Sequence, residues 1–237
     1  MLDYTEFMQM GTNLYFYKKK RMKEDQMTAL YEGLLNGNKI WVETKLKENA
    51  NFFTELAKGQ NPPVLWIGCA DSRVPANEIT NTKPGEVFVH RNLANMVVHT
   101  DINLLSVLDF GVTQLGVKHI IVCGHYNCGG INAALSNKHF GLIDNWLRNI
   151  KDVYRLHQEE LEAIKDPESK SRRLVELNVI EQVYNLSKTS TVQNAWDENK
   201  PLMVHGWVYD VANGIIKDLK VSGKNNSKIA DIYKFDF

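Results

Sequence analysis

The chain has little of what marks several common protein classes. It contains only three cysteines among 237 residues, an odd count that argues against a disulfide framework and for a reducing compartment. Basic residues are not in excess, because 28 Lys and Arg balance 28 Asp and Glu, whereas nucleic-acid-binding proteins are usually basic. No apolar run reaches the roughly 18 residues of a membrane helix. We therefore expect neither a nucleic-acid partner nor a membrane partner.

The N-terminal residues do not have the order of an export signal. An acidic and aromatic stretch, residues 3–17, precedes the basic run of residues 18–21, whereas export signals place positive charge first. With the low cysteine count, this order predicts a cytoplasmic protein. The length fits one large domain or two small ones, and we expect an N-terminal arm at residues 1–37 before a single domain at residues 38–237.

Apolar, strand-like segments alternate with helical segments along most of the chain. The alternation predicts an α/β fold, in which a mostly parallel central β-sheet is flanked by helices and preceded by a helical arm. Asn213-Gly214 predicts a type I′ turn into residues 215–221, which would add an antiparallel edge hairpin near the C-terminus. The expected helices cover residues 38–58, 101–115, 142–164 and 172–187, with a further helix starting near residue 129. The expected strands cover residues 64–68, 86–90, 118–123 and 202–209.

Two of the expected strands end in residues that bind metals. Cys69 follows the first strand, and His125 and Cys128 follow the central one. The carboxyl ends of parallel strands meet at one edge of a sheet, so these side chains are expected close together. Two thiolates and one imidazole suit zinc, and three protein ligands leave the fourth position open, as in catalytic zinc sites. The alternative is a buried free thiol and a core histidine, which the H-x-x-C spacing alone leaves equally open.

An acidic and a basic residue accompany the first of these ligands. Asp71 lies two residues after Cys69, so on an extended segment its side chain projects to the same side. It could fill the fourth metal position, but the guanidinium of Arg73 can hold the carboxylate away in a bidentate pair. Taken alone, the pair would be an ordinary loop salt bridge; beside three candidate ligands, it predicts a pair that controls access to the fourth metal position.

The motifs around these residues resemble those of the β-class carbonic anhydrase family. The resemblance extends over residues 64–211, and paired motifs at this separation are highly specific. The matching segments are C-A-D-S-R at 69–73, F-V-H-R-N at 88–92, G-H-Y-N-C-G-G at 124–130 and H-G-W-V-Y at 205–209.

This resemblance implies zinc-dependent, reversible hydration of CO2 to bicarbonate and a proton, by attack of zinc-bound hydroxide on CO2. One zinc ion per chain would be held by Cys69, His125 and Cys128. Asp71 would orient the nucleophile and Arg73 would place Asp71. Assembly into a homodimer or homotetramer is also implied.

Within the family, the sequence resembles the bacterial subgroup with an effector bicarbonate site (type II). The Trp, Arg and Tyr of that site match Trp66, Arg91 and Tyr209. The match implies allosteric control, in which bound bicarbonate favours the state with Asp71 on the metal. Each aromatic residue is equally compatible with an ordinary core position.

The ligand set also bears on the pH dependence of activity. Two thiolates cancel the 2+ charge of the ion, and a neutral centre acidifies a bound water less than a dicationic centre does. Activity is therefore expected to be low near pH 7 and to rise above about pH 8.

Three other functions share part of this pattern. A zinc-dependent nicotinamide dehydrogenase would need a G-x-G-x-x-G motif, which the sequence lacks. A thiol oxidoreductase would need C-x-x-C, but Cys123 and Cys128 are too far apart, and Cys123 fits a small apolar strand residue. The third is a zinc-stabilised binding or sensor module in which Asp71 closes the site permanently. Arg73 argues against it, because a closed site needs no competitor for the carboxylate.

Overall fold

The computed structural model describes residues 24–237, so residues 1–23 of the expected arm lie outside the described residues. Helices α1 (Glu24–Glu48) and α2 (Phe52–Leu56) belong to a compact unit that ends at Lys58, and Gly59 begins a second unit. α1 begins well before residue 38 and runs through residue 37. Its start was missed because Gly33 and Gly37 lie within it, and glycine is a poor helix former. That residues 38–237 act as one catalytic domain stays a prediction.

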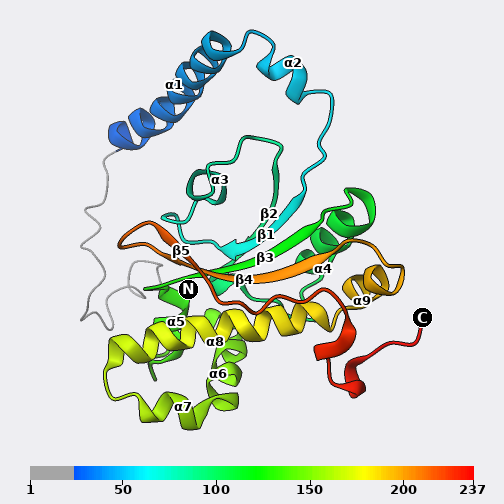
Figure 1. Cartoon of the computed structure of the whole chain (residues 1–237). Coiled ribbons are helices and arrows are strands. Elements are labelled where there is room, and N and C mark those ends of the chain that lie inside the picture. The colour runs from blue at the N-terminus through cyan, green and yellow to red at the C-terminus, as the bar shows by residue number, and fades with distance from the viewer. Residues whose placement is uncertain (1–23) are drawn as a thin grey trace, which may run out of the picture. The chain divides into compact units, whose positions relative to one another are not determined.

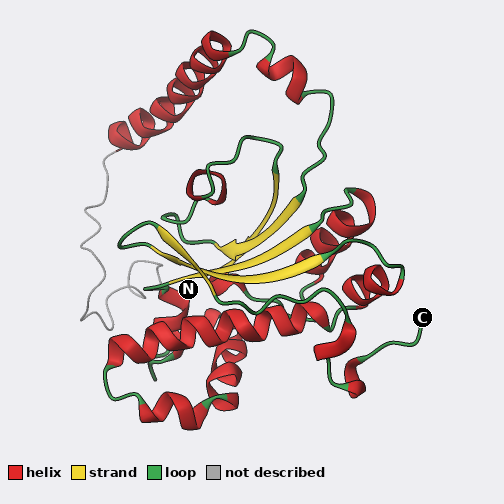
Figure 2. Cartoon of the chain, viewed as in Figure 1, coloured by secondary structure: helices red, strands yellow, loops and turns green. Residues whose placement is uncertain are grey.

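The second unit is built on a five-stranded sheet in the order β2-β1-β3-β4-β5 (Figures 1 and 2). The first four strands in this order are parallel, and β5 runs antiparallel to β4, which confirms the predicted α/β fold. The strands are β1 (Val64–Cys69), β2 (Val87–Asn92), β3 (His119–His125), β4 (Met203–Asp210) and β5 (Ile215–Asp218).

The register of β1 and β3 brings two predicted ligands to one edge of the sheet. The strands are direct neighbours, and their pairing runs from Val64 opposite His119 to Gly68 opposite Cys123. Cys69 ends β1 and His125 ends β3. Both side chains therefore lie at the carboxyl edge of the sheet, where the sequence placed them.

Helices cover both faces of the sheet. In Figure 2, the long helix α8 (Pro167–Ser187) crosses one face, and the short helix α3 (Ala76–Ile79) lies on the other side. No helix within residues 24–237 has both the length and the apolar composition to cross a bilayer. The other helices are α4 (Ile102–Asp109), α5 (Gly129–Ala134), α6 (Ile143–Leu156), α7 (Gln158–Ala163) and α9 (Ser190–Asp197), with the short turns η1 (Leu93–Asn95), η2 (Phe110–Gln114, a π-helical turn), η3 (Asn226–Lys228) and η4 (Asp231–Tyr233).

Local capping explains where the helices differ from the expectations. α8 begins before residue 172 because the Asp166 carboxylate accepts a hydrogen bond from the Ser169 amide at 2.7 Å and Pro167 occupies the first turn. The helix expected over residues 142–164 is two helices, because the backbone at His157 has φ of −115°. α9 was not expected; Thr189 caps its N-terminus.

The turn between β4 and β5 is not the predicted type I′ turn. Asp210 pairs with Ile215, so four residues separate the strands rather than two. Only Gly214 of the Asn213-Gly214 pair has a positive φ, +77°, whereas a type I′ turn needs positive φ at both central residues. The Asp210 carbonyl accepts a hydrogen bond from the Gly214 amide at 2.8 Å and closes the wider loop.

Two glycines allow α8 to pack directly on the sheet. A Cβ on Gly124 of β3 would lie 2.7 Å from Val179 Cγ2, and a Cβ on Gly206 of β4 would lie 2.6 Å from Val221 Cγ2 and 3.0 Å from Val179 Cγ1. Apolar carbon atoms normally stay about 3.5–4.0 Å apart, so neither position has room for a methyl group. Helix α8 can therefore pack this closely against β3 and β4 only because these two glycines have no side chain.

Candidate metal centre

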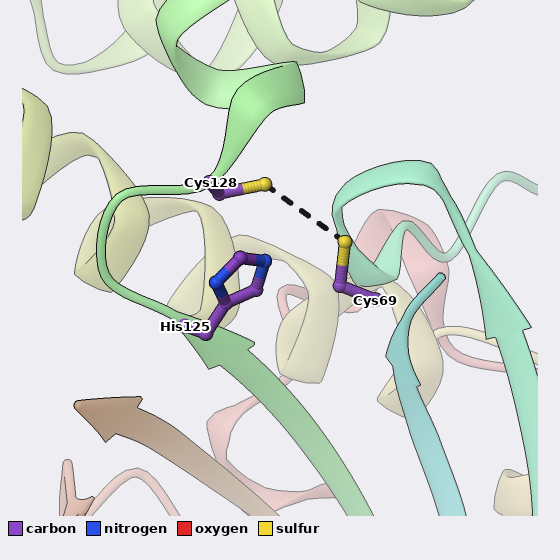
Figure 3. Close-up of side chains that lie close together, drawn as sticks. All are labelled: Cys69, His125 and Cys128. Atoms are coloured by element: carbon purple, nitrogen blue, oxygen red, sulfur yellow. Dashed lines mark hydrogen bonds between the residues drawn. The ribbon is translucent and has the colours of Figure 1, made fainter. Parts of the chain in front are cut away.

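Cys69, His125 and Cys128 converge at the carboxyl edge of the sheet (Figure 3). Their ligand atoms all lie within 4.8 Å of one another, and the three side chains are buried. His125 ends β3 and Cys128 immediately precedes α5, so the end of β3 and the three-residue turn after it supply two of the three side chains. The structure thus brings together the three residues that the sequence singled out.

One ring nitrogen of His125 faces this cluster without a hydrogen-bond partner among the described residues. Its Nδ1 lies 3.0 Å from the carbonyl oxygen of Tyr126, and a carbonyl only accepts, so Nδ1 carries the proton. Nε2 is buried and has no hydrogen-bond partner among the described residues. A buried lone pair without a donor is costly unless it binds something else. The imidazole is therefore held in the tautomer that a metal ligand needs.

The distance between the two sulfur atoms matches that of two thiolates on one tetrahedrally coordinated zinc ion. All three cysteines are free thiols, and Cys69 Sγ lies 3.9 Å from Cys128 Sγ, the contact dashed in Figure 3. Two sulfurs at about 2.3 Å from a tetrahedral zinc would be about 3.8 Å apart. The hydrogen bond with Cys128 lowers the pKa of Cys69, and the same contact raises the pKa of Cys128. The donor set and its spacing fit zinc.

Asp71 and Arg73 form the bidentate pair that the sequence predicted. Arg73 Nε donates to Asp71 Oδ1 at 2.9 Å, and Nη2 donates to Oδ2 at 2.7 Å. This hydrogen bonding lowers the pKa of the Asp71 carboxyl to about 2. Asp71 Oδ2 lies 3.8 Å from His125 Nε2, so an ionised carboxylate faces the imidazole nitrogen without occupying it. A metal held by the three side chains would keep a fourth position open for an exogenous molecule.

Arg91, one of the three predicted effector residues, holds the loop that carries Cys69. It lies on β2, where its Nε donates to the Cys69 carbonyl at 2.8 Å and its Nη2 donates to the Asp71 carbonyl. These two bonds fix the backbone on both sides of Ala70.

The other two predicted effector residues pack in one cluster on the sheet face that α3 covers. Trp66 of β1 is fully buried there, and the partly buried Tyr209 of β4 packs against the same cluster. The indole nitrogen of Trp66 has no hydrogen-bond partner among residues 24–237. It lies against the Cα of Gly68, the residue that pairs with Arg91.

Sequence reasoning missed the residues that support the ligands from behind. The Ala94 amide donates to Cys69 Sγ at 3.4 Å, and the Ala94 carbonyl accepts from Asn178 of α8 at 3.0 Å. The only signal in the sequence is a polar pair, Asn178 and Gln182, one helical turn apart in a mostly apolar stretch. Such a pair is also compatible with a solvent-facing stripe, so it did not stand out.

Comparisons with known proteins agree on one family. The family model "Carbonic anhydrase" matches residues 64–216. A carbonic anhydrase of Emericella nidulans is 51% identical over 191 residues, which are 81% of this chain and 84% of that protein. A carbonic anhydrase of Pseudomonas aeruginosa is 32% identical over 77% of this chain and 84% of its own length. Relatives therefore occur in both fungi and bacteria.

Solved structures show the same similarity. One of two tetrameric β-carbonic anhydrases from Sordaria macrospora is similar with a TM-score of 0.79 and 42% identity, covering 82% of this chain and 99% of that one. A β-carbonic anhydrase of Aspergillus fumigatus is similar with a TM-score of 0.77 and 39% identity, covering 81% and 91% of the two chains. Both are fungal, so the predicted membership of a bacterial subgroup stays a prediction.

Proposed function

This chain belongs to the β-class carbonic anhydrase family, and we propose that it hydrates CO2 reversibly with one zinc ion held by Cys69, His125 and Cys128. The observation that carries the proposal is the open Nε2 of His125, buried beside two thiols and facing an ionised carboxylate. Zinc at this position would supply a Lewis acid that lowers the pKa of a coordinated water. Everything else in the reaction is done by residues of the chain.

Asp71 is placed to orient the attacking water. Its carboxylate is ionised at any pH above about 2, so it can only accept hydrogen bonds. A water held next to His125 Nε2 would donate one O–H to Asp71 Oδ2 and present a lone pair to CO2. Arg73 keeps the carboxylate from the metal position, because it occupies both carboxylate oxygens. An active site needs this separation, whereas a closed structural zinc site does not.

The direct test is CO2 hydration by stopped flow, with zinc content measured on the same sample. We expect about one zinc per chain and activity that is lost with the metal. A chain with no zinc after purification in zinc-containing medium, or a zinc-loaded chain without activity, would contradict the proposal. The second result would instead favour a zinc-stabilised binding module.

Regulation by pH and bicarbonate is the finer part of the proposal. Two thiolates neutralise the ion, so the coordinated water would ionise at higher pH than at a dicationic centre. Bicarbonate bound near Trp66, Arg91 and Tyr209 would accept hydrogen bonds from the Arg91 guanidinium. It would then compete with the Asp71 carbonyl, to which Arg91 donates in this structure. Loosening that bond would free Asp71 to move towards the metal. The unpartnered Trp66 indole nitrogen supports an anion site at this place.

Two Trp substitutions test whether Trp66 takes part in an effector site or only packs in the core. Trp66→Phe keeps an aromatic ring and removes the unpartnered N–H, so inhibition by bicarbonate should weaken while activity at high pH is kept. Trp207→Phe is the matched control, because Trp207 packs edge-on against Trp66 with ring centroids 6.2 Å apart. Equal bicarbonate sensitivity in both variants and the wild type would remove the effector site from the proposal.

The proposed assembly is a homodimer or homotetramer of a cytoplasmic protein. The relative from Sordaria macrospora is tetrameric, and α1 exposes apolar side chains at helical spacing, among them Leu30, Tyr31 and Leu34. A stripe of this kind is typical of an interaction surface. Light scattering coupled to size-exclusion chromatography measures the subunit number, and a monomer at micromolar concentration would contradict the assembly. A cytoplasmic location fits the three free thiols.

A further inference from the structure

A backbone amide supports one of the proposed metal ligands from a strained position. Ala94 lies in turn η1, directly after β2, and its N–H points at Cys69 Sγ, 3.4 Å away. Ala94 has φ of +64° and Asn95 has φ of +49°, both in the left-handed region that residues with a Cβ rarely adopt. Both residues are buried. Two consecutive strained residues next to a ligand persist only where surrounding contacts hold them.

Helix α8 supplies those contacts through buried amide side chains. Asn178 Nδ2 donates to the Ala94 carbonyl at 3.0 Å, and Gln182 Nε2 donates to Asn178 Oδ1 at 3.2 Å. Gln182 Oε1 accepts from the Val97 amide at 2.8 Å. Asn178 is 1% exposed and Gln182 is fully buried. Each of the two side chains therefore makes one hydrogen bond to the backbone of the segment that follows β2.

Burying an amide side chain in this core costs free energy unless its hydrogen bonds are formed. Each buried amide must find all its partners, and an apolar side chain of similar size would pack without that requirement. The partners of Asn178 lie on Ala94 on one side and on Gln182 on the other. Because the Ala94 carbonyl is pinned, the amide of the same residue is turned towards Cys69.

We propose that Asn178 is a positioning residue for the metal centre, which acts by holding the Ala94 N–H against the Cys69 thiolate. The inference rests on the proposed zinc function of Cys69. An N–H dipole aimed at a thiolate stabilises its negative charge and fixes the side chain in its binding orientation. Groups of this kind behind a ligand typically contribute 10- to 100-fold to metal affinity.

The test measures zinc affinity by competition with a chromophoric chelator, using the full-length protein. Asn178→Leu removes the amide and should weaken zinc binding by about 10- to 100-fold. Gln193→Leu is the matched control, because Gln193 is equally buried but bonds to the C-terminal residues Tyr233 and Phe235. It should lower the melting temperature and leave zinc affinity unchanged. A second substitution, Ala94→Gly, should restore about tenfold in the Asn178→Leu background, because glycine adopts the left-handed conformation without strain.

Two spectroscopic measurements distinguish positioning from general destabilisation. In the cobalt-substituted protein, loss of the N–H···S bond makes the sulfur a better electron donor, so the thiolate-to-cobalt charge-transfer band should move to longer wavelength in Asn178→Leu but not in Gln193→Leu. In wild-type protein loaded with 113Cd, the Ala94 amide proton should show scalar coupling to the metal through Cys69 Sγ. This second measurement needs no variant to fold.

The outcomes separate this inference from the function on which it rests. If wild-type protein binds no zinc, the proposed metal centre itself is wrong. If wild-type protein binds zinc, wild-type affinity and an unshifted band in Asn178→Leu overturn the positioning role. Absence of the Ala94 coupling in the cadmium-loaded wild type also overturns it.

Discussion

Gly124→Ala is expected to disable the metal centre by displacing it, without altering a single ligand. The new methyl group would lie 2.7 Å from Val179 Cγ2, about 1 Å closer than an ordinary carbon contact. Either α8 or the end of β3 has to move by that amount. His125 is the next residue, and a misplacement of about 1 Å at a reacting centre costs on the order of 100-fold in rate. We therefore expect kcat/KM for CO2 hydration to fall by about 100-fold.

Gly206→Ala is the control, because it introduces a similar steric clash at a residue that does not adjoin a proposed metal ligand. Its methyl group would meet Val221 Cγ2 at 2.6 Å and Val179 Cγ1 at 3.0 Å, so it presses on the same helix from β4. Overpacking of this kind costs about 1–3 kcal/mol, which in a chain of this size corresponds to a fall in Tm of about 2–12 °C for either variant.

Stopped-flow rates, zinc content and Tm, measured together, decide the case. Gly206→Ala should keep its rate within about threefold of wild type, because it displaces no ligand. Gly37→Ala, with no described atom within 4 Å of its Cβ, should lose neither stability nor activity. A wild-type rate in Gly124→Ala, or equal rate losses in the Gly124 and Gly206 variants, would refute the reasoning.

Three further predictions concern the dyad and pH. Asp71→Ala and Arg73→Ala should each lower CO2 hydration by about 100-fold with little change in Tm, whereas wild-type rates would reduce the pair to a loop salt bridge. Arg73 holds the Asp71 pKa at about 2, below its ordinary 3.8, so the pair stabilises the fold above about pH 4 and loses this effect as pH falls towards 2. Asp71→Asn should accordingly flatten the pH dependence of urea unfolding in that range, and an unchanged slope would contradict the assignment. The wild-type rate should rise steeply above about pH 8; a flat profile between about pH 6.5 and 9 would contradict the charge argument.

Two of the three proposed ligands, Cys69 and His125, were predictable from sequence because each ends a short, strongly apolar strand. Local composition marks such strands, and parallel topology then brings their carboxyl ends together. Cys69 and His125 follow from that reasoning without any knowledge of the helices. Asp71 follows as well, because alternation along an extended segment sets the side on which it projects, whereas Arg73 reaches Asp71 through a turn in which the Arg73 amide also donates to the Asp71 carboxylate at 3.0 Å.

The support behind the ligands was not predictable, because it depends on contacts between distant segments. Asn178 bonds to a residue 84 positions earlier in the chain, and nothing near either residue announces the pairing. The turn after β4 was misjudged for a similar reason. Asn213-Gly214 is a strong local signal, but Asp210 is held by Arg172 of α8 at 3.1 Å, and the strand pairing stops at Asp210.

The adjacency of β1 and β3 also governs how the chain folds. Cys69 and Cys128 are 59 positions apart, with α3, β2 and α4 between them, so the unfolded chain does not bring the two sulfur atoms together. Metal capture must follow the long-range pairing of β1 with β3, a slow kind of step because chain entropy is lost before contacts form. Because the ion would bind the folded chain and not the unfolded one, its binding free energy would add to the free energy of unfolding, by about 4 kcal/mol at a free zinc concentration of about 1,000 times Kd. The ion that would activate water would also hold the ends of β1 and β3 together.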